Sequence, residues 1–153
     1  MRSLIIVVSV HHGNTRKVAL ALSEVLGGVV KGPGEVSQEE LVSYDLIGFG
    51  SGVYFGKFHR RLLRFVENLS PCVGKKSFVF STSGLGKKEY NRSLEKLLVQ
   101  RGFVVLGSFA CRGFDTFGPL WLVGGMNRGR PNEKDLKDAM RFALEIQALC
   151  ERG

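Results

Sequence analysis

The sequence predicts an α/β fold in which a five-stranded parallel sheet lies between two layers of helices. Apolar runs of strand length alternate along the chain with segments of helical periodicity. The first run, LIIVV, is apolar at every position, which is typical of a strand buried on both faces. Connections of helical length favour right-handed crossovers between parallel strands. There is no second composition regime, repeat or low-complexity tract, so we expect residues 1–153 to form a single domain.

The same patterns place each element. The expected strands, in chain order, are Leu4–Val10, Gly28–Lys31, Asp45–Gly50, Lys76–Ser81 and Phe103–Cys111. The expected helices are Thr15–Leu26, a short one capped by Ser37, Phe58–Leu69, Lys88–Arg101, and one opened by Pro131-Asn132-Glu133 and running to about Cys150. Ser37 and Glu40 have the spacing of a capping box. The segment from Arg112 to Pro131 is glycine-rich and irregular.

Composition narrows the class of protein. The net charge of +8 favours an anionic cofactor, substrate or partner. No apolar run approaches the roughly 20 residues of a membrane-spanning helix, so we expect no membrane association. The start MRSLIIVVSV is too short and too β-branched for a signal peptide. The three cysteines form neither a C-x-x-C motif nor an even disulfide framework, which predicts reduced thiols in a cytoplasmic protein.

Ligands of such sheets bind outside the carboxyl ends of the strands, so the loops there carry the functional prediction. The first loop is HHGNT, residues 11–15. Gly13 permits close backbone approach, and amides at a helix start favour an anion. Asn14, Thr15 and the imidazoles of His11 and His12 can donate to phosphate oxygens. The plainer interpretation is that Asn14 or Thr15 only caps the helix.

The next two loops at this edge are also rich in glycine. Residues 50–57 read GSGVYFGK, and an aromatic pair between glycines suits a planar ligand that stacks on a ring. The alternative is a turn whose Tyr54 and Phe55 fold back into the core. Residues 81–88, STSGLGKK, add small and polar groups. No G-x-x-x-x-G-K-[ST] motif is present, GFGSG lacks the position and spacing of a dinucleotide fingerprint, and no acidic pair follows the first strand.

These segments together resemble the flavodoxin family. VSVHHGNTRKVALAL is similar to its phosphate loop and first helix, whose core motif is T-G-N-T, and GSGVYFGKFH and FSTSG resemble its next two flavin loops in the correct order. FACRGFDTFGPLWLVGGMNRGRPNEKDL resembles the tail of a small branch of that family. The resemblance implies a doubly wound sheet of order 2-1-3-4-5 in a three-layer α/β/α fold. It also implies FMN, held without a covalent bond.

The resemblance carries over position by position. Gly13, Asn14 and Thr15 match the phosphate motif, and His12 stands at its first threonine. Val10 occupies the slot of the family's leading hydroxyl residue, one position after Ser9. The implied cofactor-binding set in the phosphate loop is Ser9, His11, His12, Gly13, Asn14 and Thr15. Around the isoalloxazine it is Ser51, Gly52, Val53, Tyr54, Phe55 and Gly56 on one side, and Ser81, Thr82, Ser83, Gly84, Leu85 and Gly86 near the pyrimidine edge.

The chain departs from the family in charge and in one insert. Flavodoxins that act as mobile carriers are typically acidic, whereas a chain with a pI near 9.7 would be drawn to an acidic partner. His59-Arg60-Arg61, Arg64 and Lys87-Lys88 form either a solvated surface or a docking site. Aromatic residues of the insert at 112–130, with Asp115, could cover the flavin, form a homodimer interface or plug the sheet edge. They are Phe114, Phe117 and Trp121.

Two classes of function remain. The first is an FMN electron-transfer protein or small flavin oxidoreductase, whose acceptor is an acidic redox partner or a small molecule. No residue resembles a nucleophile or general base, so no catalytic side chain and no metal ligand is predicted, and carrier and enzyme are not distinguished. The alternative is a flavin-free module that binds a nucleotide or another phosphate-bearing partner. Nucleic acid is not the expected partner, because the aromatic residues lie in the loops instead of alternating with basic ones.

Overall fold

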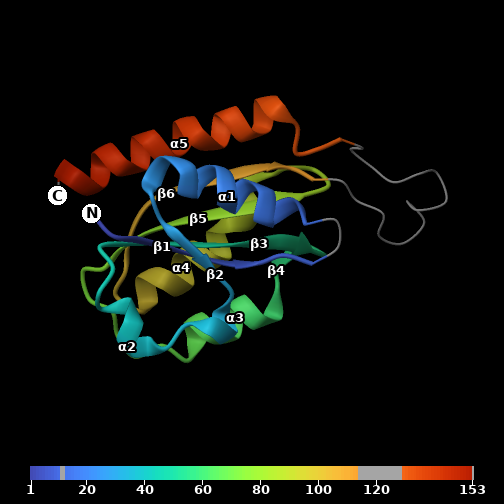
Figure 1. Ribbon diagram of the computed structural model, residues 1–153. Coiled ribbons are helices and arrows are strands. Elements are labelled where there is room, and N and C mark those ends of the chain that lie inside the picture. Colours follow the sequence, from blue (N-terminus) through green and yellow to red (C-terminus); the bar gives the residue numbers. More distant parts are fainter. Residues whose placement is uncertain (11–12, 114–128, 153) are drawn as a thin grey trace.

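The computed structural model describes residues 1–10, 13–113 and 129–152 and has the predicted three-layer α/β/α architecture (Figure 1). Its sheet has the order β2-β1-β3-β5-β6, with all of these pairings parallel. Counting only these five strands, this is the predicted order 2-1-3-4-5. A sixth strand, β4, pairs antiparallel with the end of β3.

The strands are β1 (Ser3–Val8), β2 (Val29–Lys31), β3 (Leu46–Tyr54), β4 (Lys57–Phe58), β5 (Lys76–Ser83) and β6 (Val104–Arg112). The α-helices are α1 (Asn14–Leu26), α2 (Gln38–Leu41), α3 (Arg60–Glu67), α4 (Arg92–Gln100) and α5 (Glu133–Arg152). Two 3₁₀ turns, η1 (Pro33–Glu35) and η2 (Lys88–Asn91), precede α2 and α4. The predicted capping box is present, since Ser37 Oγ accepts from the amide of Glu40 while the Glu40 carboxylate accepts from the amide of Ser37.

Two apolar layers hold the helices to the sheet. Helices α1 and α5 cover one face, where Ile5, Val7 and Phe80 of the strands meet Leu22 and Ile146 (Figure 1). Helices α3 and α4 cover the other face, where the sheet residues Leu4, Ile6, Ile47 and Phe49 pack on Leu62, Val66, Leu94 and Leu98. Successive residues of β1 point to opposite layers, which explains why its sequence is apolar at every position.

Two glycines of β3 make room for aromatic rings of β5. A Cβ on Gly48 would stand 2.2 Å from the ring of Phe78, and one on Gly50 would stand 2.3 Å from the ring of Phe80. Both rings therefore lie across the backbone of the neighbouring strand. This explains the alternation of glycine in the strand sequence LIGFG, where each glycine is required by the packing of a ring.

The third strand is longer than the predicted Asp45–Gly50, and the loop after it is correspondingly shorter. Strand β3 continues through Gly50 to Tyr54 and turns at Phe55-Gly56 into β4. Phe58 pairs with Val53 in this hairpin, so α3 begins at Arg60 and not at the predicted Phe58. Residues 88–91, predicted as α-helix, form the 3₁₀ turn η2 instead.

Two further predictions, on membrane-spanning helices and on the cysteines, can be compared with the structure. In the part of the chain that the structure describes, no helix combines the length and apolarity needed to cross a membrane. Cys72, Cys111 and Cys150 all lie in that part and are free thiols. The predicted roles of Phe114, Asp115, Phe117 and Trp121 fall on residues outside the described ranges.

Candidate functional site

Four parallel strands end side by side at the carboxyl edge of the sheet. Their last residues are in register, with Val8 opposite Ser51, Gly52 opposite Thr82 and Thr82 opposite Cys111. The segments that follow β1, β3 and β5 therefore leave the sheet next to one another, at the end where the β3 arrow points in Figure 1. This is the edge at which open α/β sheets bind their ligands.

The first loop delivers the amino end of α1 to this edge. Gly13 precedes the helix with a left-handed φ of 65°, and a Cβ there would meet no heavy atom of the described residues within 4 Å, its chain neighbours aside. Ser9 Oγ accepts from the amide of Arg16 at 3.1 Å, which closes the loop onto the first turn. That turn has no acidic residue and carries Arg16 and Lys17, both exposed. Open space, a positive helix end and two cations suit an anion.

Thr15 and Thr82 join the first loop to the end of β5. Their Oγ1 atoms lie 2.8 Å apart, and the residues are 2% and 4% exposed. One hydroxyl donates and the other accepts, so the accepting hydroxyl keeps its own proton for a further acceptor. The sequence predicts both threonines as cofactor ligands, and in the structure they also form a hydrogen bond with each other. Gly113 packs closely on Asn14, since a Cβ on Gly113 would stand 2.6 Å from Asn14 Nδ2.

The second predicted loop is a hairpin with an aromatic residue at its tip. Phe55 and Gly56 form the two-residue turn with φ values of 52° and 77°. Two positive φ values define the turn that matches the twist of a hairpin, and a glycine or asparagine is the usual first residue. Phe55 takes this conformation although its Cβ disfavours it, and its side chain is 85% exposed. Strain combined with an exposed ring indicates a functional position.

Ser51, Tyr54 and His59 fix the base of the hairpin. Ser51 Oγ donates to the carbonyl of Gly52 at 2.6 Å and accepts from the amide of His59 at 3.1 Å. His59 Nδ1 accepts from the amide of Arg61 at 3.0 Å and so caps α3, and its ring lies edge-on to Tyr54. Burial lowers the pKa of His59, and the charges of Arg61 and Arg60 lower it further. The cap requires the same neutral ring, because an accepting Nδ1 carries no proton.

The third loop is held by three polar contacts, of which the one between Ser81 and Asn91 is fully buried. Ser81 Oγ donates to Asn91 Oδ1 at 2.6 Å, and Asn91 Nδ2 donates to the carbonyl of Phe109 at 3.0 Å. Ser83 Oγ accepts from the amide of Gly86 at 2.7 Å. Gly86 has a left-handed φ of 63°, and a Cβ there would stand 3.1 Å from the amide nitrogen of Arg112. Leu85 is half exposed at the tip of the loop.

The structure thus places most of the predicted residues at one edge. Thr15, Ser51, Gly52, Ser81 and Thr82 are buried there, Phe55, Gly56 and Leu85 are exposed, and the other described members are partly accessible. His11 and His12 lie outside the described residues. Sequence reasoning missed Asn91 and the capping role of His59. A fully buried asparagine in a helical pattern gives no sign of which strand it contacts, and histidine is not among the usual helix caps.

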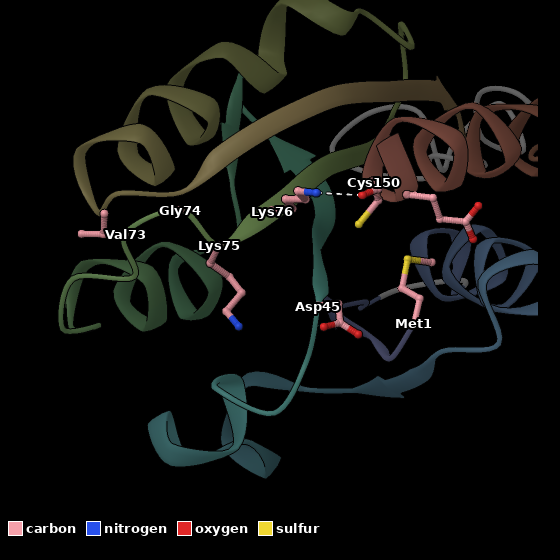
Figure 2. A pocket seen from close by; sticks show the side chains of 8 residues that line it. Met1, Asp45, Val73, Gly74, Lys75, Lys76 and Cys150 are labelled. Carbon is pink, nitrogen blue, oxygen red and sulfur yellow. Dashed lines mark hydrogen bonds between the residues drawn. The ribbon is translucent and has the colours of Figure 1, made fainter. Parts of the chain in front are cut away.

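A cavity of about 390 Å³ lies at the opposite edge, where the strands begin (Figure 2). It is lined by Met1, Asp45, Val73, Gly74, Lys75, Lys76, Cys150 and Glu151. Lys76 Nζ donates to the carbonyl of Cys150 at 2.7 Å, and Lys75 Nζ donates to the carbonyl of Tyr44 at 2.6 Å. Both ammonium groups are thus engaged by backbone, and the Lys76 contact satisfies a carbonyl near the negative end of α5. None of the predicted site residues lines this cavity.

The sheet order and the glycine- and hydroxyl-rich loops at its carboxyl edge define a flavodoxin-like α/β protein. Comparison with known proteins agrees, because residues 4–111 match the family model of the flavodoxin domain. The chain therefore belongs to the flavodoxin family. A relative in Methanocaldococcus jannaschii, an uncharacterised protein, is 41% identical over 148 residues, which cover 95% of this chain and 98% of the relative.

Solved structures agree on the fold. A flavodoxin from the domain Archaea covers 99% of both chains with a TM-score of 0.75 and 17% identity. The Streptococcus pneumonia TIGR4 flavodoxin covers 97% of this chain and 99% of its own, with a TM-score of 0.71 and 16% identity. The two-electron reduced flavodoxin of Megasphaera elsdenii covers 90% of this chain and 97% of its own, with a TM-score of 0.64 and 20% identity.

Proposed function

We propose that this protein binds FMN without a covalent bond at the carboxyl edge of its sheet and exchanges electrons through it. The observation that carries the proposal is that the loops after β1, β3 and β5 lie together at one edge of the sheet. The hydrogen bond between Thr15 and Thr82 joins the first of these loops to the end of β5. The family to which the chain belongs supports the identity of the cofactor.

The residues at this edge fit a phosphate ester that also carries a planar ring system. The space around Gly13, the amino end of α1 and the cations Arg16 and Lys17 favour a phosphate. The exposed ring of Phe55 offers an apolar face for a planar ring system. Within the described residues, no group of three or more His, Cys, Asp or Glu side chains is placed to hold a metal ion.

In this proposal each loop has its own task. Gly13, Asn14 and Thr15 hold the phosphate, together with the predicted donors Ser9, His11 and His12. Residues 51–56 and 81–86 enclose the ring system and exclude water from it. FMN supplies the redox chemistry when bound, and the backbone amides and carbonyls of the two glycine-rich turns set its reduction potential by hydrogen bonding. The electrons pass to or from another protein or a small-molecule acceptor.

The test is reconstitution. The protein is incubated with FMN or with riboflavin, in oxidised and in dithionite-reduced form, and desalted before a visible spectrum is taken. We expect the protein to retain FMN and to release riboflavin, because only FMN engages the phosphate loop. If the protein retains FMN in neither redox state, the proposal is refuted, and a flavin-free phosphate-binding module becomes the better explanation.

A further inference from the structure

Cations dominate the segments around the proposed flavin edge. Residues 13–17, 55–61 and 84–92 follow β1, β3 and β5, and together they contain eight lysines or arginines and one carboxylate, Glu89. At the opposite edge, residues 38–45 around α2 contain three carboxylates and no lysine or arginine. Each of these three segments next to the proposed cofactor therefore carries an excess of positive charge.

Five of these cations form one surface, which we name the basic rim. It consists of Lys57, Arg60, Arg61, Lys87 and Lys88, all of them exposed. Arg60 and Arg61 begin the helix that directly follows β4, and Lys88 begins η2. The hairpin turn and η2 are neighbours, because a Cβ on Gly56 would stand 4.0 Å from the ring of Tyr90. The exposed Phe55 lies at the tip of the same hairpin.

The basic rim is not explained by folding. In the part of the chain that the structure describes, ion pairs are made by Lys31, Arg130, Lys134, Lys137 and Arg141, and none involves the rim. Arg60 and Arg61 also occupy the first turn of α3, where the helix dipole favours acidic residues, and that turn contains none. Arg60 and Arg61 therefore oppose the helix dipole without an ion pair among the described residues, which costs stability and points to an external anion.

We infer that the basic rim is the docking surface for an acidic protein that exchanges electrons with the cofactor. This inference rests on the proposed function. The cations are spread over β4, α3 and η2, which suits a broad protein surface more than a single small anion. A surface of exposed charges steers association and is typical of brief contacts between redox proteins, which bury little area. The exposed Phe55 supplies an apolar contact at the tip of the adjoining hairpin.

The test compares two chains of equal charge. The rim variant carries Lys57→Glu, Arg60→Glu and Lys87→Glu. The control variant carries Lys96→Glu, Arg141→Glu and Arg152→Glu, at exposed positions on α4 and α5. Each reversal removes two charges, so both variants go from the formal charge of +8 to +2. The probes are the acidic haem domain of cytochrome b5 and the basic protein cytochrome c, and the readout is binding by calorimetry at several salt concentrations.

We expect wild type to bind cytochrome b5 more tightly than cytochrome c, with an affinity that falls as salt rises through 0.1 M. The rim variant should lose about thirtyfold in affinity, roughly threefold for each screened reversal, and the control variant about threefold or less. Thermal unfolding separates binding from folding, since Arg60→Glu agrees with the dipole of α3 and should not lower the melting temperature.

Equal losses in the two variants would overturn the inference, because net charge alone would then account for binding. Tighter binding of a single-stranded oligonucleotide than of cytochrome b5 would overturn it in favour of nucleic acid. Neither result depends on flavin, and the FMN spectrum is measured on the same samples. A chain that retains FMN but does not prefer the acidic probe loses only this inference, whereas a chain that never retains FMN loses the proposed function.

Discussion

The buried hydrogen bond between Thr15 and Thr82 allows a quantitative prediction about how the site is assembled. The two Oγ1 atoms are 2.8 Å apart, and both residues are almost fully buried. Valine keeps the branched shape of threonine and replaces only the hydroxyl by a methyl group. In Thr15→Val or Thr82→Val the remaining hydroxyl would be buried without its partner, so we expect each variant to lose about 1.5 kcal/mol in free energy of unfolding.

The double variant should be less damaged than the two single variants suggest. Replacing both hydroxyls by methyl groups removes the bond and the polar groups together, which we expect to cost about 1 kcal/mol or less. The coupling energy in the double-mutant cycle is then about 2 kcal/mol. For a chain of this size each single variant should melt about 3 to 6 °C below wild type. Urea unfolding and calorimetry of the four proteins give these values.

The same four proteins separate structural support from cofactor binding. If the threonines also contact the phosphate, the double variant should regain stability yet bind FMN at least about tenfold more weakly than wild type, because two donors are gone. Additive losses of stability, with no coupling between the sites, would refute the hydrogen bond as a link between the loops. Unchanged FMN affinity in the double variant would limit both residues to a structural role.

Four further predictions concern single features of the site. Phe55→Gly should raise the free energy of unfolding by about 1 kcal/mol, since it relieves a left-handed φ, and should weaken FMN binding; a less stable variant in urea unfolding would contradict this. The lowered pKa of His59 means that the unfolded chain binds the proton more tightly, so stability should fall as the pH drops below about 6.5, the ordinary value for histidine. His59→Asn, which keeps a capping side chain, should reduce that slope in unfolding curves between pH 5 and 8, and an unchanged slope would assign it to other groups. Burial raises the pKa of the Cys111 thiol to about 12, so a disulfide reagent at pH 8 should modify the half-buried Cys72 first, and rapid modification of Cys111 in the native protein would contradict its burial. FMN affinity measured from pH 6 to 9 should weaken as His11 and His12 lose their charge, and a profile identical to that of His11→Ala/His12→Ala would reduce the pair to packing.

The parallel sheet between two layers of helices could be predicted from local signals in the sequence, whereas its strand order was implied by the resemblance to the flavodoxin family. Apolar runs such as residues 4–8 show burial on both faces, and connections of helical length leave few arrangements for a parallel sheet. The hairpin at the end of β3 was not predictable in the same way. Its turn is Phe55-Gly56 where Asn-Gly is usual, and Gly50 and Gly52 suggest a loop although they lie in a strand.

The loops of the candidate site could be located from the sequence, whereas their internal contacts could not. Thr15 is a plausible cap or ligand in the sequence, and nothing local shows that its hydroxyl meets Thr82, 67 positions away. Asn91 contacts Ser81 and the backbone of Phe109, which only the packing of η2 against β5 and β6 brings together. Such contacts arise from tertiary structure, so residue type and spacing predict the edge but not the bonds that hold it.

FMN binding at the phosphate loop can be measured by fluorescence titration of the apoprotein with FMN at constant ionic strength, with riboflavin as the matched ligand that lacks the phosphate. We expect saturable binding of one FMN per chain, quenching of the flavin fluorescence as the ring enters the site beside Phe55, and an affinity for riboflavin at least about tenfold weaker, as the loss of charge-assisted hydrogen bonds implies. Absence of saturable FMN binding, or equal affinity for the two flavins, would contradict the proposed FMN binding.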